Sequence, residues 1–201
     1  MNHSPSRSLS PSLNRTRPRA LRPLAVLALL LALPAAATSM LRREVPELSR
    51  AADAVVRGTV RRVESRWAGD GKRIVTDVEI EVAEALKGAP GHTVLVTQPG
   101  GRVGDIGQKV SGLAAFTPGE EVVVFLDRRG KAAFSVRGMA QGKFRVQRSK
   151  DGKAALAVPE SPGDARVLDP ATGEEVRPAR HAVPLESLRS AVRAAAAGKK
   201  Q

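Results

Sequence analysis

The sequence contains no cysteine and no tyrosine, and aromatic residues make up only 2% of its 201 residues. The absence of cysteine excludes disulfide bonds, thiolate zinc sites and cysteine nucleophiles. A core must therefore be built mainly from valine, isoleucine, leucine and alanine, and β-branched side chains favour strands because they fit a pleated surface. The aromatic side chains expected in that core are Phe116, Phe125, Phe134, Phe144 and Trp67.

Acidic residues are missing from the first 37 positions, which contain five arginines. An apolar run of ten residues, 24–33, ends at Pro34 and is followed by small residues. A basic, then apolar, then small-residue order is typical of a secretory signal, and ten residues are fewer than the roughly 20 that span a bilayer. We predict a signal peptide over 1–37, cleaved after Ala37 or Ser39, and a mature protein exported to the periplasm or beyond without a stable membrane span. An uncleaved amino-terminal anchor is the alternative.

The chain is strongly basic, with a formal net charge of +13 that falls to +8 when the five arginines of the signal segment are subtracted. Such an excess favours anionic partners such as polysaccharide, lipid headgroups, acidic proteins or nucleic acid, and it also serves solubility. Basic side chains gather near one predicted hairpin, whose turn is the Gly69–Gly71 segment. The resulting candidate basic face consists of Arg61, Arg62, Lys72 and Arg73.

Strand patterns dominate the mature chain. The clearest period-two alternation lies in residues 74–82, with one apolar and one mostly acidic face. Residues 54–67 also alternate, but their phase changes midway, which predicts a β-bulge or bend at Gly58. Residues 121–126 are apolar on both faces, as in a central strand. Short strands joined by turns predict an all-β barrel or sandwich, with further strands at 92–98, 132–136, 143–147 and 154–158.

Helical patterns occur near both ends of the mature chain. A short helix is predicted over 46–53, and a longer one over 185–197 has an apolar stripe formed by Leu185, Leu188 and Val192. Between the last strand and the second helix the chain is rich in proline and polar residues. We therefore predict four parts: a signal peptide (1–37), a β-barrel domain (38–158), a Pro-rich linker (159–184) and a carboxy-terminal helix with a tail (185–201).

The order of these motifs resembles netrin-like domains, including the tissue inhibitors of metalloproteinases. Residues 52–60 (ADAVVRGTV) resemble the first barrel strand of that family, and the Leu-Lys-Gly of 86–88 followed by 92–97 resembles its next two elements. The segment 119–126 resembles its later Gly-then-apolar strand, so the resemblance covers about 47–146. It implies an OB-like, closed or partly open barrel of about five to six strands in a secreted setting.

The chain departs from this family at the residue that carries the inhibitory activity. Metalloproteinase inhibitors of the family chelate the target zinc through an amino-terminal cysteine held by disulfides. This chain has no cysteine, and its predicted mature start is Thr38 or Met40. No inhibitory residue can be carried over, so the resemblance implies fold more than function.

Patterns that would support catalysis or metal binding are weak. A Ser–His–Asp site would have to combine Ser111 or Ser135 with Asp105 and one of two distant histidines, His92 and His181, and no G-x-S-x-G turn frames a serine. The carboxylates of Asp77, Glu79 and Glu81 share one strand face but are about 7 Å apart, too far to hold one ion unaided. We expect them to pair with Arg61, Arg62 or Lys72. No catalytic residue, metal or cofactor is predicted.

A glycine-rich segment after the third barrel strand is the candidate binding loop. It lacks the Gly-Lys-Ser/Thr of a phosphate loop, so we interpret it as a connecting loop that can also form a partner-binding surface at the barrel mouth. The residues proposed for that surface are Gly100, Gly101, Arg102, Gly104 and Asp105. Nucleic acid is disfavoured as a partner because stacking needs exposed aromatic rings, and the few rings here are expected inside.

The leading hypothesis is an exported, non-enzymatic binding domain whose macromolecular partner is unknown and is either a protein or an anionic polysaccharide. The alternative is an inhibitor or accessory partner of a secreted metalloprotease. A third hypothesis is a hydrolase whose nucleophile no motif reveals.

Overall fold

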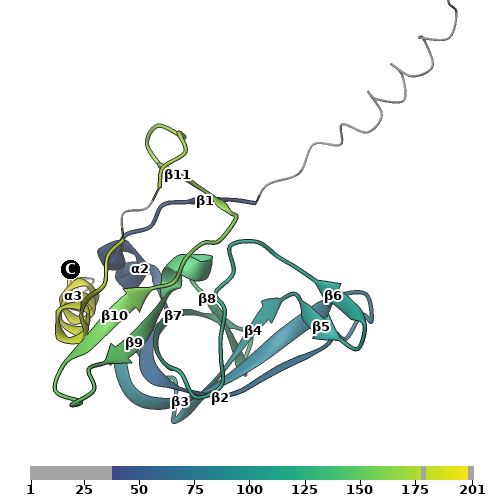
Figure 1. Cartoon of the computed structure of the whole chain (residues 1–201), viewed down its shortest axis with the longest axis horizontal. Helices are drawn as coiled ribbons and strands as arrows, with labels where there is room; N and C mark the ends of the chain where they lie inside the picture. Colours follow the sequence, from purple (N-terminus) through teal and green to yellow (C-terminus); the bar gives the residue numbers. More distant parts are fainter. Residues whose placement is uncertain (1–37, 178–179, 199–201) are drawn as a thin grey trace, which may run out of the picture. The chain divides into compact units, whose positions relative to one another are not determined.

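The computed structural model describes residues 38–177 and 180–198, and this part of the chain is mainly β (Figure 1). The predicted signal peptide lies outside the described residues, so its cleavage and the export of the protein stay predictions. The elements are, in chain order, β1 (Ser39–Leu41), α2 (Val45–Ala51), β2 (Ala54–Trp67), β3 (Ile74–Lys87), β4 (Thr93–Pro99), β5 (Gly101–Val103), β6 (Ile106–Gln108), β7 (Glu121–Arg129), β8 (Ala133–Val136), the 3-10 helix η2 (Met139–Gly142), β9 (Lys143–Arg148), β10 (Ala155–Pro159), β11 (Arg166–Leu168), β12 (Val183–Pro184) and α3 (Leu185–Ala197).

Five strands form a ring. In the main sheet β7 pairs with β2, β2 with β3, β3 with β4 and β4 with β8, and a further pairing of β8 with β7 closes the circle. All of these contacts are antiparallel except that of β4 with β8, where Val96 pairs with Phe134 in a parallel sense. Strands β9, β10 and β12 continue the sheet outward from β7. The predicted mainly β, barrel-like fold with two helices is therefore confirmed.

Strand β7 is buried on both faces because it separates two cores. Val122, Val124 and Leu126 belong to a cluster formed by the ring strands, which also contains Val56, Val78, Ile80, Val94, Val96 and Phe134. The intervening Val123 and Phe125 belong to a second cluster on the other face of the strand. This double burial explains why 121–126 lacks alternation, as the sequence indicated for a central strand.

The phase change predicted in β2 is present, and it falls at Arg61. The register with β3 shifts three times, and the shift between Val60 and Arg62 leaves Arg61 and Arg62 both exposed. Gly58 lies at an earlier shift, where a Cβ would be 2.3 Å from the carbonyl oxygen of Glu81. The strand therefore bends where only glycine lets the two backbones approach so closely.

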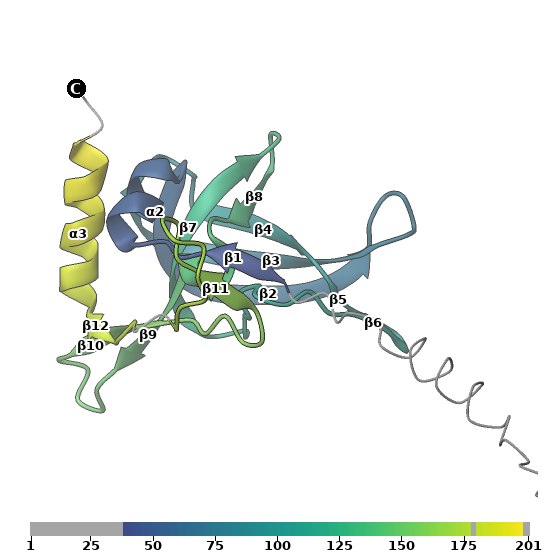
Figure 2. The ribbon, with the colours of Figure 1, turned by 90° about the horizontal axis from the view of Figure 1, so that it is seen from above.

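Both helices cover the second core. Leu188 and Val192 of α3 are buried with Leu48 of α2 and with Val55 and Phe125 of the sheet. Figure 2 shows the two helices side by side at one end of the sheet. The predicted apolar stripe of the carboxy-terminal helix is thus its packing face.

The segment predicted as a Pro-rich linker is more ordered than expected. Within it, β11 pairs in parallel with β1, and Val167 is buried with Met40 in a small third core. At its end β12 pairs with β10 and leads directly into α3. Strands of two or three residues are too short to give a period-two pattern, so the sequence indicated a linker here and did not reveal these strands.

Candidate functional site

The two groups of residues predicted for partner binding lie at the same end of the barrel. The glycine-rich segment forms a short hairpin, β5–β6, beside the last residues of β2 and the first residues of β3 (Figures 1 and 2). Hydrogen bonds fasten this hairpin to β3: the Thr76 hydroxyl donates to the Gly100 carbonyl at 2.8 Å, and the Ile74 amide donates to the Gln108 side chain at 2.6 Å. The segment was predicted as a connecting loop, and the structure corrects this to a docked hairpin.

Gly101 allows the hairpin to lie this close to the barrel. A Cβ at this position would lie 2.3 Å from Ser65 Oγ and 2.4 Å from Thr76 Oγ1. Its φ of 129° is also one that residues with a side chain rarely adopt. Gly104 and Asp105 form the exposed turn between β5 and β6. The glycines of the candidate loop therefore position the hairpin, and the side chain that it offers to a partner from β5 is Arg102.

Two large apolar side chains are exposed at this end of the barrel. Trp67, the last residue of β2, is 39% exposed, and Ile106, the first residue of β6, is 53% exposed. The prediction that Trp67 lies in the core was wrong, whereas Phe125, Phe134 and Phe144 are buried as expected. Trp67 directly precedes the Ala-Gly-Asp-Gly turn, and a residue at a strand end is less enclosed than one in the middle.

Two cations are also exposed on these hairpins. Lys72 is exposed in the turn between β2 and β3, and Arg102 is exposed on β5, where its Nε donates to the Gly104 carbonyl. Neither forms an ion pair with a carboxylate of the described residues. We call Trp67, Lys72, Arg102 and Ile106 the hairpin-end surface.

The other members of the predicted basic face are neutralised within the chain. Arg61 pairs with Glu81, and Arg62 lies 3.0 Å from Glu64 and 3.9 Å from Glu79. Arg73 pairs with Asp70 at 2.9 Å in the turn itself, and neighbouring Arg66 pairs with Asp77 at 2.7 Å. These contacts confirm the expectation that the acidic face of β3 pairs with nearby arginines. Of the four predicted basic residues, Lys72 alone remains without a carboxylate partner in the described chain.

The two serines weighed for catalysis have other partners. The Ser135 hydroxyl accepts a hydrogen bond from Arg129 at 2.9 Å. Ser111 bonds to Asp164, whose pKa is lowered mainly by its hydrogen bond with Lys109 and further by that with Ser111. Among the described residues, no group of three or more histidine and acidic side chains is placed to hold a metal ion. In the same part of the chain, none of the helices has the length and apolar character needed to cross a bilayer.

A buried lysine lies at the base of the loop that precedes β7. Lys143 is 1% exposed, and its ammonium group contacts Glu120 at 2.8 Å, Glu160 at 3.1 Å and the Ala115 carbonyl. It also lies 4.8 Å from the centre of the Phe116 ring. These partners come from the loop before β7 and from the residue after β10, so Lys143 holds both segments against β9.

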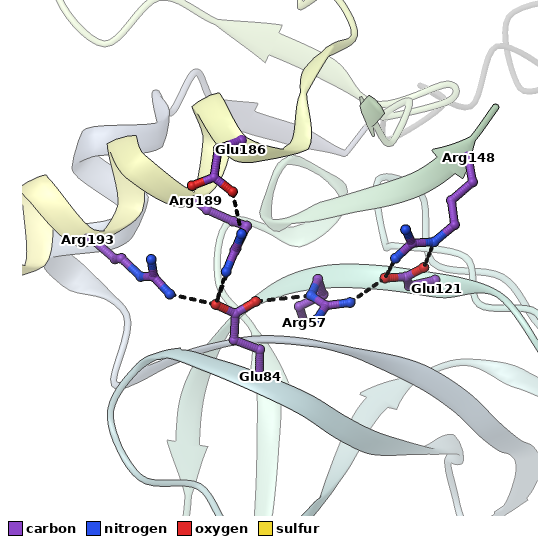
Figure 3. A network of polar contacts seen from close by, with 7 residues as sticks. All are labelled: Arg57, Glu84, Glu121, Arg148, Glu186, Arg189 and Arg193. Carbon is purple, nitrogen blue, oxygen red and sulfur yellow. Dashed lines mark hydrogen bonds and ion pairs between the residues drawn. The ribbon is translucent and has the colours of Figure 1, made fainter. Parts of the chain in front are cut away.

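The largest ion-pair network joins α3 to the barrel (Figure 3). Glu84 of β3 receives hydrogen bonds from Arg57 of β2 and from Arg189 and Arg193 of α3, at 2.6 to 3.1 Å. Arg57 also donates to Glu121 of β7, which Arg148 contacts at 2.9 Å. Burial alone would raise the pKa of Glu84, but the hydrogen bonds and charges of Arg189 and Arg57 outweigh it and hold that pKa below the usual 4.5.

This network predicts a loss of stability in acid. The pKa of Glu121 is lowered in the same way, since hydrogen bonds from Arg148 and Arg57 outweigh its burial. Because both folded-state pKa values lie below the unfolded value of about 4.5, the stabilisation is complete above that pH and is lost as the pH falls below it. We expect the urea concentration at the midpoint of unfolding to decrease as the pH is lowered from 5 to 3. The double substitution Glu84→Gln and Glu121→Gln should make this decrease smaller. An equally steep dependence in the double variant would contradict this assignment.

No protein-family model matches the chain, and a search of curated proteins finds no match either.

Proposed function

We propose that this protein is an exported, non-enzymatic binding domain and that it holds a protein partner at the hairpin-end surface. The observation that supports this most is the exposure of two large apolar side chains, Trp67 and Ile106, and of the cations Lys72 and Arg102, on two hairpins at one end of the barrel. Tryptophan and arginine are the residues most enriched among those that dominate binding energy at protein interfaces. A rigid scaffold also limits the entropy that is lost on binding.

The charge distribution favours a protein over an anionic polysaccharide. A polyanion is held by many free cations, and here Arg61, Arg62 and Arg73 already pair with carboxylates of the same chain. What remains is two exposed apolar side chains and two exposed cations on these hairpins, and protein interfaces combine such apolar and polar groups. The partner best suited to it has an apolar recess bordered by acidic side chains.

The fold is consistent with this use. We propose that the ring is an OB-like barrel, a five-stranded architecture that binds its ligands through one sheet face and through loops that include the connection between the first two strands. Numbered by their order in the chain, the five ring strands are β2, β3, β4, β7 and β8. Around the ring they lie in the order first, second, third, fifth and fourth, and the fourth pairs with the first. The connection between its first two strands is 68–73, which contains Lys72 of the hairpin-end surface.

The test compares binding by surface variants of the mature chain. We expect the immobilised protein to retain a specific partner from the exported proteins of its source, and the double substitution Trp67→Ala and Ile106→Ser to lose it. Reversing the two charges, with Lys72→Glu and Arg102→Glu, should weaken retention and make it less dependent on salt.

Matched control variants distinguish binding at this surface from non-specific binding. Leu156 is 42% exposed on β10, away from the hairpins, and Lys131 is exposed in the turn between β7 and β8. Leu156→Ser and Lys131→Glu should leave retention unchanged. Equal losses in the control variants, or full retention by the Trp67 and Ile106 variant, would contradict the proposal, as would turnover of a substrate at a site containing these residues.

A further inference from the structure

A pocket remote from the hairpin-end surface has the composition of a binding site for an organic anion. It has a volume of about 410 Å³ and lies between the β1–α2 connection, β9 and the segment that leads to β12. Ligand pockets in proteins commonly have volumes of about 300–1,000 Å³. Three arginines, Arg42, Arg177 and Arg180, line it together with Glu44 and several apolar side chains.

Arg180 is the central polar residue of this pocket. Its guanidinium lies 4.7 Å from the centre of the Phe144 ring, and its Nη1 donates to the Gln141 carbonyl at 2.8 Å. Its other terminal nitrogen, Nη2, is buried and has no hydrogen-bond acceptor among the described residues. A buried donor without an acceptor is uncommon and costs stability, so a side-chain rotation that brought this nitrogen to a ligand oxygen would be favoured.

The charges around the pocket are not balanced within the described chain. Arg42 is engaged by Asp169 at 2.8 Å, and Glu44, the one acidic lining residue, lies 3.8 Å from Arg42. Arg177 and Arg180 form no ion pair with any carboxylate of the described residues. Burial lowers the pKa of Arg180, and the charge of Glu44 only partly opposes this effect. A bound anion would compensate both guanidinium groups.

The remaining lining residues favour an anion with an apolar body. Val45, Phe144, Val176 and Val183 form the apolar walls, which inorganic phosphate or sulfate would leave in contact with water. We propose that this pocket binds a carboxylate whose oxygens accept hydrogen bonds from Arg180 and Arg177 and whose aliphatic part packs against these walls. The same chemistry is offered by a free aliphatic acid and by the carboxy-terminal residue of a peptide. This proposal does not depend on the binding of a protein at the hairpin-end surface.

The test is a calorimetric titration of the mature chain with four probes. The acids are N-acetyl-leucine and a hexapeptide that ends in leucine with a free carboxylate, and the controls are their neutral amides. We expect saturable binding of at least one acid and, for its amide, binding about tenfold weaker or more, as for the loss of a charge-assisted hydrogen bond. Tighter binding of the hexapeptide identifies a peptide terminus as the source, and tighter binding of N-acetyl-leucine identifies a small acid.

Substitutions assign the binding to the pocket. Arg180→Gln should abolish the preference for acid over amide, whereas Arg50→Gln, at an exposed arginine of α2, should preserve it. If the Arg180 variant unfolds, the exposed Arg177 supplies the test, since Arg177→Gln should weaken acid binding severalfold without loss of structure. Equal affinity for acids and amides, tighter binding of inorganic phosphate, or unchanged acid binding in the Arg177 and Arg180 variants would overturn the proposal.

Discussion

Replacing Lys143 with methionine is expected to destabilise the protein by about 3–5 kcal/mol, the usual cost of removing one partner from a buried ion pair. The ammonium group of this lysine is enclosed between Glu120 and Glu160, at 2.8 and 3.1 Å. Methionine has a similar length and fills the same space, so the loss is electrostatic. It leaves two poorly solvated carboxylates near one another, and the remaining cation is Arg145, at 3.9 Å from Glu120. The measurement is the free energy of unfolding, taken from urea titration at pH 7.

Two comparisons isolate the buried charge. Lys131→Met changes a lysine that is exposed in a turn and should alter stability by no more than about 0.5 kcal/mol. Adding Glu120→Gln and Glu160→Gln to the Lys143 variant removes the unpaired carboxylates and should restore part of the loss. A Lys143 variant as stable as the Lys131 variant would contradict the buried arrangement.

Truncating Leu188 to alanine is expected to cost about 2–5 kcal/mol, as for other buried leucines. This side chain is 2% exposed on the packing face of α3, in the core shared with Leu48 and Phe125. If the carboxy-terminal helix were instead attached through a loose linker without packing against the sheet, the substitution would have almost no effect on stability. Calorimetry of the thermal transition measures the change directly.

The matched control for this experiment is Leu156, which is 42% exposed on β10. Leu156→Ala should change stability by less than about 0.5 kcal/mol, because little apolar surface is lost from contact with the protein. A similar small effect at Leu188 would show that α3 does not share the second core.

Strand β3 could be predicted from the sequence because buried and exposed residues alternate along it. In β3 the inner positions Ile74, Val78 and Ile80 are buried, and the acidic positions between them pair with arginines. The absence of alternation in β7 was equally informative, because burial on two sides leaves no polar face. The three-residue pairing of β1 with β11 offered no such pattern, since two alternations occur by chance.

The candidate site could be predicted only in part. The glycine-rich segment and Lys72 were found because turn residues and charges are local signals. The exposure of Trp67 and Ile106 was missed, because it depends on which strand ends project from the ring. The free state of Lys72 and the pairing of Arg61 and Arg62 depend on the register of β2 against β3, which a bulge shifts by one residue. The Arg180 pocket unites segments distant in sequence and has no local motif.

The fluorescence of Trp67 tests the role of the hairpin-end surface most directly, because the chain has one tryptophan and no tyrosine. In the free protein, acrylamide should quench this emission readily, as expected for an indole that is 39% exposed. When the retained partner is added, or a tryptophan-free version of it, the emission should shift to shorter wavelength and quenching should fall. Emission and quenching that stay unchanged at saturating partner would contradict binding at this surface.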